Sequence, residues 1–276
     1  MGHAEVHVTK KRNFPFQALR IPVQGDGNTA NFPPLKKYIF YCINQLIDQY
    51  YLSPPFLDIG CGIGDISQYV ASKGWYGKAI DFSDIAIEKT KENLTLFRYI
   101  DTEKKSLFQE TGTFKTIFLL DVLEHVENDN AALKKISSLL TVGGHALIGV
   151  PSNPKEWRWD DDYYGHYRRY TAEEIRKKSM DVNLKPLVCW DFTYPVFWMM
   201  RRIYTRLKSF PKNIDHDKHL RTTVSSSVNA WDIPLLSNFL SQDSIFWRAV
   251  YNMQFAYFRD DVHKGYEMIV LTKRMA

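Results

Sequence analysis

The segment FLDIGCGIG, residues 56–64, joins an apolar run to an acid, Asp58, and to three glycines at alternate positions, Gly60, Gly62 and Gly64. Glycine allows the tight turns that lead from a strand into a helix. It also lets a ligand approach the backbone where a Cβ atom would collide with it. The segment therefore predicts a strand, a turn that binds a nucleotide-like ligand and a helix in direct succession.

The residues in and after this turn distinguish between two kinds of nucleotide-like ligand. The spacing is G-x-G-x-G rather than the G-x-G-x-x-G of dinucleotide-binding turns. Asp58 would repel a pyrophosphate, whereas a carboxylate suits the ammonium and sulfonium cations of S-adenosylmethionine (SAM). Asp81 ends the next apolar run, where a carboxylate can accept hydrogen bonds from both hydroxyls of a ribose. Both features favour SAM.

Strand-like and helical patterns alternate on both sides of the glycine turn. Apolar runs predict strands at residues 56–59, 75–80, 96–100, 116–120, 145–150, 186–192 and 267–272, and helical patterns lie at residues 35–51, 65–72, 84–94 and 130–140. Thr171 and Glu174 form a capping box that predicts a further helix to about residue 181. This alternation predicts βαβ units and a parallel sheet.

Four motifs in this order resemble those of the class I SAM-dependent methyltransferases. They are LDIGCGIGD from residue 57, AIDFSD from residue 79, LLDVLEHVEND from residue 119 and VGGHALIGVP from residue 142. The resemblance covers roughly residues 36–192 and the last strand. It implies an α/β, Rossmann-like sheet of seven mostly parallel strands, of which the last is antiparallel.

The resemblance also assigns residues to the cofactor. It implies that the amino-acid end of SAM is held by Asp58, Gly60, Cys61, Gly62 and Gly64. Asp81 would then bind the ribose, and Phe82 would lie beside the adenine. For the acid that usually follows the third strand we choose Asp101, with Glu103 and Glu110 as nearby alternatives.

The acceptor side is predicted at the carboxyl edge of the sheet, where ligands of open α/β folds bind. Asp121, Glu124 and His125 follow the fourth predicted strand, and we expect Asp121 to contact SAM as well. The loop after the fifth strand mixes aromatic and charged residues and includes His166, which is typical of a binding wall. Its GHYRRYT segment resembles a branch of small-molecule methyltransferases that includes quinone-pathway O-methyltransferases.

Two routes for the reaction at this edge stay open. If the acceptor is a hydroxyl, His125 or His166 can act as the general base, oriented by Asp121 or Glu124. The alternative is a divalent metal, because this set resembles the Glu-x-x-Glu-His plus distant His ligands of small-RNA 2′-O-methyltransferases and of metal-binding quinone O-methyltransferases. Asp121 stands where the first Glu is expected, and its shorter reach favours the base.

The predicted domain organisation is one SAM-binding domain with two additions. Residues 35–192 and 265–276 form the domain, residues 1–34 an N-terminal extension or lid, and residues 193–264 a helical cap insertion, which is too long for a structureless loop. Within the insertion, residues 196–208 predict a basic amphipathic helix that includes Arg201, Arg202 and Arg206. This helix either packs on the domain as a cap or contacts an anionic membrane or a lipid substrate.

Composition and charge limit the kinds of partner expected for this protein. The 36 Lys and Arg against 31 Asp and Glu give a net charge of only +5, interspersed along the chain, so nucleic acid is an unlikely partner on charge grounds. The 3 cysteines form no Cys-x-x-Cys pair, and the N-terminus lacks the basic segment followed by an apolar segment that is typical of a secretory signal peptide. Together these features predict a cytoplasmic protein.

The predicted function is SAM-dependent methylation of a small-molecule acceptor, on oxygen, with a lipid or quinone-like substrate as one option. RNA or protein methylation is the alternative, and a SAM-binding or nicotinamide-binding protein without methyl transfer is a third. The sequence does not identify the acceptor.

Overall fold

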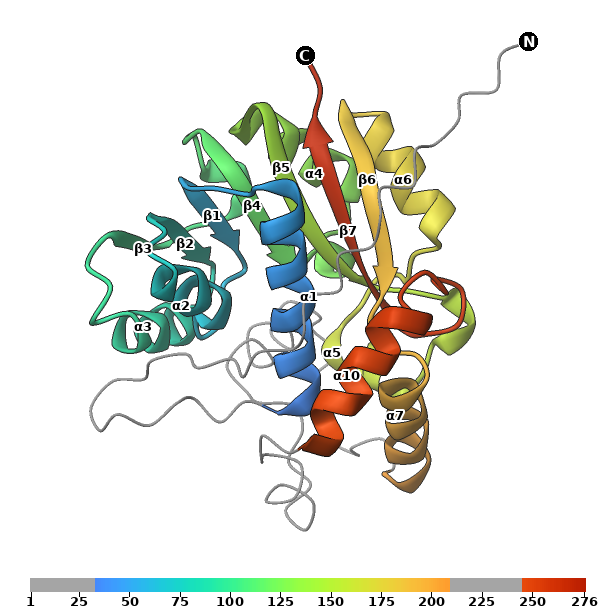
Figure 1. Ribbon diagram of the computed structural model, residues 1–276. Helices are drawn as coiled ribbons and strands as arrows, with labels where there is room; N and C mark the ends of the chain where they lie inside the picture. Colours follow the sequence, from blue (N-terminus) through green and yellow to red (C-terminus); the bar gives the residue numbers. More distant parts are fainter. Residues whose placement is uncertain (1–32, 209–244) are drawn as a thin grey trace.

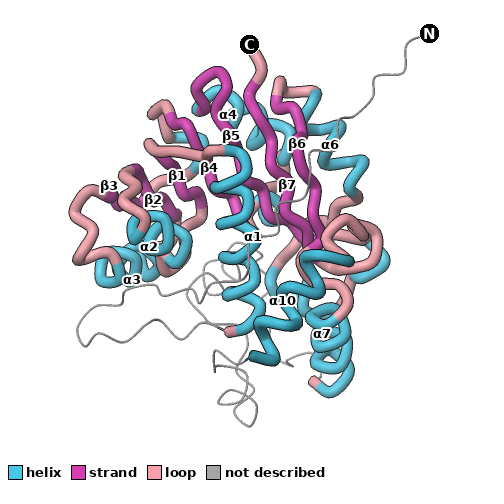
Figure 2. The backbone as a smooth tube through the Cα atoms, viewed as in Figure 1, coloured by secondary structure: helices cyan, strands magenta, loops and turns pink. Residues whose placement is uncertain are grey.

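A computed structural model describes residues 33–208 and 245–276 of the chain, and these form a sheet with helices on both faces (Figures 1 and 2). The seven strands have the order β3-β2-β1-β4-β5-β7-β6. They are β1 (Phe56–Ile59), β2 (Gly77–Asp81), β3 (Ile100–Lys104), β4 (Phe114–Leu120), β5 (Leu140–Pro151), β6 (Leu184–Asp191) and β7 (Glu267–Arg274). The strands from β3 to β5 pair in parallel, and β7 pairs antiparallel with both β5 and β6. The predicted fold class is therefore confirmed.

The helices follow the strands in the predicted alternation. They are α1 (Pro34–Tyr50), α2 (Asp65–Ser72), α3 (Asp84–Asn93), α4 (Asp129–Leu139), α5 (Trp159–Tyr164), α6 (Ala172–Met180), α7 (Val196–Leu207) and α10 (Ile245–Tyr257). Side-chain caps begin several of them: the Thr171 hydroxyl accepts from the Glu174 backbone N–H at 3.1 Å, as the capping box predicts. Short 3-10 turns lie at Leu107–Gln109, Leu123–His125 and Pro154–Glu156.

The sheet divides the hydrophobic core into two layers because successive strand residues point to opposite faces. Phe56 and Phe118 pack with α1, α2 and α10, whereas Leu57 and Ile117 pack with α4 and α6 on the other face. All four side chains are fully buried. Apolar residues on both sides of the central strands account for their continuous apolar runs in the sequence.

The two described helices of the predicted insertion pack onto the N-terminal helix α1. Tyr38 of α1 stacks on Phe197 of α7 and on Tyr251 of α10, with ring centroids 5.9 and 5.3 Å apart. The Tyr251 hydroxyl donates to the Pro34 carbonyl oxygen at 2.9 Å. These contacts hold α7 and α10 beside the carboxyl edge of the strands (Figure 1). The rest of the insertion and the predicted lid at residues 1–32 lie outside the described residues.

The third strand differs from its prediction. The apolar run at residues 96–100 is a turn in which Leu96 and Tyr99 are exposed, and the strand begins only at Ile100. The strand β3, IDTEK, has Ile100 as its one apolar residue and lies at the edge of the sheet, where it pairs with β2 alone. Among the described residues, no helix has the length and apolarity needed to cross a membrane.

Candidate active site

The glycine turn connects the end of β1 to α2. The Gly60 and Cys61 backbone N–H groups donate to the Ile80 carbonyl oxygen at 2.8 and 3.1 Å, which ties the turn to β2. Gly60 has a φ of 66°, and a Cβ atom there would overlap the Val122 side chain. Glycine is therefore required for backbone conformation and for packing against the segment after β4.

Two buried carboxylates support this turn. Asp58 accepts a hydrogen bond from the Ser67 hydroxyl at 2.6 Å, and burial raises its pKa to about 7 although the Ser67 hydrogen bonds oppose the shift. Asp81 accepts from the Gly62 and Ser83 backbone N–H groups at 3.0 and 2.9 Å. Burial raises the pKa of Asp81 as well, against these hydrogen bonds. Asp81 thus fixes the turn against the end of β2.

A cavity of about 400 Å³ extends from this turn to the loops after β4 and β5. Its walls come from the glycine turn (Asp58, Gly60, Cys61, Gly62), the segment after β4 (Asp121, Glu124, His125), the loop after β5 (Asp160, Asp161, Tyr164, His166, Arg169), α1 (Lys36, Phe40), α7 (Arg201, Tyr204) and the start of β7 (Tyr266, Glu267). The predicted cofactor turn and the predicted acceptor residues therefore line one space, whose volume is typical of small-molecule sites.

Four predicted cofactor residues do not line this cavity. Gly64 and Asp81 are not among its lining residues, although Asp81 accepts a hydrogen bond from Gly62, which is, and Phe82 is 40% exposed. Asp101 is placed differently from its prediction, because it lies near the amino end of β3 and pairs with Lys78 at 3.2 Å. Since β3 runs parallel to β2, that end is opposite the glycine turn, so the structure does not place Asp101 beside the turn.

Glu103 and Glu110, the alternatives to Asp101, also form their contacts away from the cavity. Glu103 pairs with Lys78 at 3.1 Å, and the buried Glu110 accepts from the Thr111 and Gly112 backbone N–H groups at 2.9 and 2.7 Å. Neither lines the cavity.

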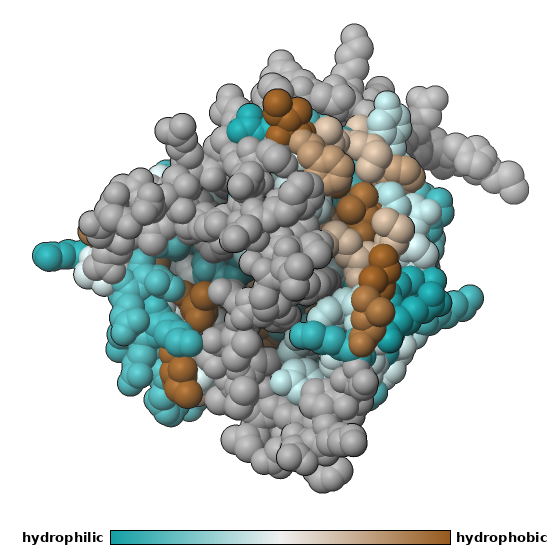
Figure 3. Space-filling view, turned by 90° about the horizontal axis from the view of Figure 1, so that it is seen from below, coloured by the Kyte–Doolittle hydropathy of each residue, from teal (hydrophilic) through white to brown (hydrophobic). Residues whose placement is uncertain are grey.

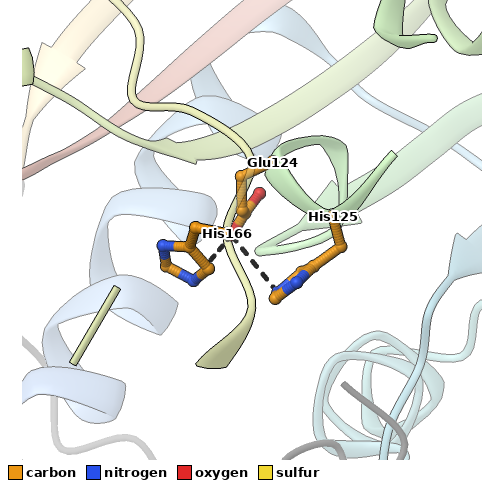
Figure 4. Close-up of side chains that lie close together, drawn as sticks. All are labelled: Glu124, His125 and His166. Carbon is orange, nitrogen blue, oxygen red and sulfur yellow. Dashed lines mark ion pairs between the residues drawn. The ribbon is translucent and has the colours of Figure 1, made fainter. Parts of the chain in front are cut away.

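Glu124, His125 and His166 lie together at the far end of the cavity (Figure 4). Glu124 Oε1 is 3.9 Å from His125 Nε2 and 4.0 Å from His166 Nε2, and the two imidazole rings meet edge-on with centroids 4.9 Å apart. One candidate ligand atom from each side chain lies within 4.8 Å of the others. Asp121 lines the cavity and is not one of the three residues of this cluster.

Burial sets the charge of this cluster. Burial, together with the neighbouring His166, lowers the pKa of His125 to about 3, although a hydrogen bond with the Gly165 backbone opposes the shift. Burial and the Asp121 carboxylate raise the pKa of Glu124 well above its ordinary range. Glu124 Oε2 is buried and has no hydrogen-bond partner among the described residues. His125 is therefore neutral at physiological pH.

His166 is held by a buried network around Asp161, a residue that was not among the predicted site residues. Asp161 Oδ1 lies 2.9 Å from His166 Nδ1 and 2.7 Å from the Arg169 guanidinium. Asp161 Oδ2 accepts from Arg201 at 2.9 Å and from the Arg158 backbone N–H at 2.8 Å. Burial alone would raise the pKa of Asp161, but His166 and the two guanidinium groups outweigh it and lower that pKa.

Comparison with known proteins identifies the family. A family model described as a methyltransferase domain matches residues 36–187. The chain belongs to this methyltransferase family. A ubiquinone biosynthesis O-methyltransferase of Marinobacter nauticus is 26% identical over 138 residues, which are 47% of this chain and 58% of that protein. One from a Caulobacter species is 29% identical over 99 residues, 34% of this chain and 39% of that protein. The chain spans about half the length of such relatives, or less.

Solved structures of similar fold cover more of the chain. The cyclase SpnF has a TM-score of 0.56 and 14% identity, covering 95% of this chain and 88% of that chain. A geranyl diphosphate C-methyltransferase of Streptomyces coelicolor has a TM-score of 0.54 and 13% identity, covering 95% and 92%. These likenesses confirm the methyltransferase-like fold, and they include a cyclase, so the fold alone does not define the reaction.

The buried Asp58 gives a pH dependence that can be measured. Its folded-state pKa of about 7 lies above the value near 3.9 of an unfolded chain, so only the folded protein holds this proton between those values. The stabilisation is complete at low pH and is lost as the pH rises through 7. We expect Asp58→Asn, which stays neutral, to gain a few kcal/mol of unfolding free energy relative to wild type between pH 5 and pH 8, measured by urea denaturation.

The control for this measurement is Asp84→Asn, which changes an exposed carboxyl on α3 and should show no such trend. A constant difference between Asp58→Asn and wild type across the pH range would mean that Asp58 is ionised throughout.

Proposed function

We propose that this protein transfers a methyl group from SAM to a hydroxyl of a small aromatic acceptor. The observation that carries the proposal is the single cavity that joins the glycine turn to Glu124, His125 and His166. A donor held at the turn and an acceptor held at the histidines would face one another across this space. Positioning of that kind supplies much of the rate when the donor is already activated.

The residues around the turn fit SAM. Asp58 presents a buried carboxylate to the cavity, and a cationic ligand would favour its ionised form. Asp81 accepts two backbone hydrogen bonds and, with four lone-pair sites, retains capacity for ribose hydroxyls. Bound SAM supplies a methyl group activated by its sulfonium charge. Asp58 and Gly62 would hold its amino-acid end, and Asp81 its ribose.

At the other end, His166 is the better base. The acceptor O–H bond would break as the proton moves to His166 Nε2, and the oxygen would attack the methyl carbon with the electron pair that it keeps. As the new O–C bond forms, the bond from that carbon to the sulfonium sulfur would break, and its electron pair would pass to sulfur so that S-adenosylhomocysteine leaves. The Asp161 carboxylate beside Nδ1 stabilises the imidazolium that results. His125 is a poor proton acceptor because its pKa is lowered to about 3.

The walls of the cavity favour a small aromatic acceptor. Phe40, Tyr164, Tyr204 and Tyr266 offer aromatic surface, and Glu124 and Glu267 offer hydrogen-bond acceptors for hydroxyl groups. The names of the relatives, which are ubiquinone biosynthesis O-methyltransferases, support a quinone-like phenol. The described residues line a site of about 400 Å³, a volume that suits a small molecule.

Labelled SAM tests the proposal directly. Purified protein incubated with methyl-labelled SAM and separate small-molecule, RNA and protein fractions should label the small-molecule fraction, and mass spectrometry should find a gain of one methyl group on oxygen. Label that enters only RNA or protein would contradict the proposed acceptor class.

Asp81→Ala should weaken SAM binding by about 1–3 kcal/mol, because a charged hydrogen-bond acceptor is lost.

A divalent metal at Glu124, His125 and His166 is the rival route. The buried, unpartnered Glu124 Oε2 favours it, because such an atom lacks a partner that a cation could provide. A Zn²⁺ ion there would lower the pKa of the acceptor hydroxyl. Two atoms bound to one Zn²⁺ at about 2.1 Å lie at most about 4.2 Å apart, and Glu124 Oε1 is already near that limit, at 3.9 and 4.0 Å from the two histidine Nε2 atoms.

Turnover measurements separate the two routes. We expect His166→Ala to lower kcat by about 100-fold or more and His125→Ala to lower it much less, with no effect of chelation and dialysis. A metal route predicts instead that both variants lose activity equally, and that chelation abolishes turnover until Mg²⁺, Mn²⁺ or Zn²⁺ is restored.

Contact with a lipid surface through α7 is a further part of the proposal. Phe197, Arg201 and Thr205 form the buried stripe of this helix, as a cap helix requires. The opposite stripe exposes Met199, Ile203 and Leu207, at 52%, 52% and 80%. Figure 3 shows apolar side chains gathered beside polar ones on the face seen from below. This exposed apolar stripe resembles that of helices that lie in a membrane interface.

Two of the basic residues that a membrane contact would use already form ion pairs within the protein. Arg201 is buried and pairs with Asp160, and Arg202 stacks on Trp198 and pairs with Glu156. The apolar stripe is therefore the better target for mutation. We expect Ile203→Glu with Leu207→Glu to reduce sedimentation with anionic liposomes several-fold, whereas Leu96→Glu, an exposed site near β3, should not. Equal sedimentation of all three proteins would remove α7 from any lipid contact.

A further inference from the structure

Proton positions in the network around Asp161 follow from the chemistry of its donors. Asp161 is fully buried and lies between the guanidinium groups of Arg169 and Arg201. These two positive charges favour an ionised carboxylate, and an ionised carboxylate can only accept hydrogen bonds. The 2.9 Å contact with His166 Nδ1 therefore requires a proton on Nδ1. In a neutral imidazole the lone pair is then on Nε2.

Glu124 does not orient the His166 ring in the same way as Asp161. Glu124 Oε1 is 4.0 Å from His166 Nε2, which is beyond hydrogen-bond distance. Asp121 also lines the cavity, and the charge of His166 acts to lower its pKa, against the effect of burial. The backbone strengthens the link to Asp161, because the His166 N–H donates to the Asp161 carbonyl oxygen at 3.0 Å. The His166 ring is thus tied to Asp161 through both its side chain and its main chain.

Arg201 extends this network to the cap helix. It lies on α7, is 4% exposed, and binds Asp160 through two contacts of 2.8 and 2.6 Å as well as Asp161. Its remaining Nη1 donates to the Glu156 carbonyl oxygen at 3.0 Å. Arg169 is fixed in turn by the Ser152 and Tyr266 carbonyl oxygens. Both guanidinium groups are therefore held by neighbours besides Asp161.

We propose that Asp161 is a positioning residue that fixes His166 as the Nδ1–H tautomer, and that Arg169 and the cap-helix Arg201 hold Asp161 ionised for this purpose. The Nε2 lone pair then faces Glu124 and the cavity. The use of that lone pair to accept the acceptor's proton rests on the proposed function. The tautomer itself does not, because it follows from the contacts of Asp161 alone.

Nitrogen NMR of the full chain, labelled at its histidines, reads the tautomer without any acceptor. At pH 8 we expect the His166 ring of the wild type to show a protonated Nδ1 and an unprotonated Nε2. The signal is assigned by its disappearance in His166→Gln. A ring protonated at Nε2 alone, or at both nitrogens, would overturn the proposal. This result stands whether or not methyl transfer to any acceptor is found.

A pair of variants tests the part played by Asp161. In Asp161→Asn the side-chain oxygen should stay at the Oδ2 position, where it accepts from both Arg201 and the Arg158 backbone N–H, so that the amide NH₂ takes the Oδ1 position and donates to His166 Nδ1, and the ring proton moves to Nε2. The matched control is Asp160→Asn, which also removes a charge from Arg201 but does not touch His166, and which should keep the Nδ1–H ring. For a confirmed acceptor, Asp161→Asn should lower kcat by about 100-fold or more with little change in KM.

The outcomes of the variant test are distinct. An unchanged Nδ1–H ring in folded Asp161→Asn would overturn the role of Asp161. If this variant does not fold, the wild-type spectrum alone decides the tautomer, and Asp161→Glu, which keeps the charge, should then retain the Nδ1–H ring. Loss of that ring in a folded Asp161→Glu variant would likewise contradict the proposal.

Discussion

The turn after β1 is the constraint on which the site depends. β1 lies between β2 and β4, where the strand order reverses, and ligands of open α/β sheets bind at that point. Gly60 passes so close to Val122 that only glycine fits, and Asp81 fixes the Gly62 N–H from the next strand. The turn is thereby attached to both neighbours of β1. Its position in turn determines where the segment after β4 can place Glu124 and His125.

Sequence patterns predicted this central part well because each rule applied locally. The strand at residues 56–59, the helix at 65–72 and the Thr171 cap all depend on neighbouring residues, and all are present. The third strand was misplaced because an exposed apolar turn precedes a polar edge strand, and the choice of Asp101 rested on that placement of the strand. An apolar run does not by itself show that its residues are buried, in particular next to an edge strand that pairs with only one other strand.

The ion pairs between residues far apart in the sequence could not be predicted from it. Asp161 is the middle residue of the acidic run 160–162, and nothing local separates it from the acids beside it. Its role depends on Arg169, eight residues later, and on Arg201, forty residues later. Arg201 itself was expected on the surface of an amphipathic helix. The available signal was its place on the stripe with Phe197 and Thr205, which is the buried stripe of α7.

The charges around the cavity also constrain what can bind there. Asp58, Asp121, Glu124 and Glu267 contribute carboxyl groups, whereas Arg169 and Arg201 are already paired with Asp160 and Asp161. Burial raises the pKa of Glu267 well above its ordinary range, and the nearby Asp121 adds to the shift. Buried carboxyl groups with few cations among them resist ionisation, and a cationic ligand would relieve that cost. The same arrangement disfavours an acceptor that carries a carboxylate or phosphate at its reacting end. A cationic donor and a neutral acceptor would both suit these charges, and this is the pairing in the proposed methyl transfer from a sulfonium to a phenol.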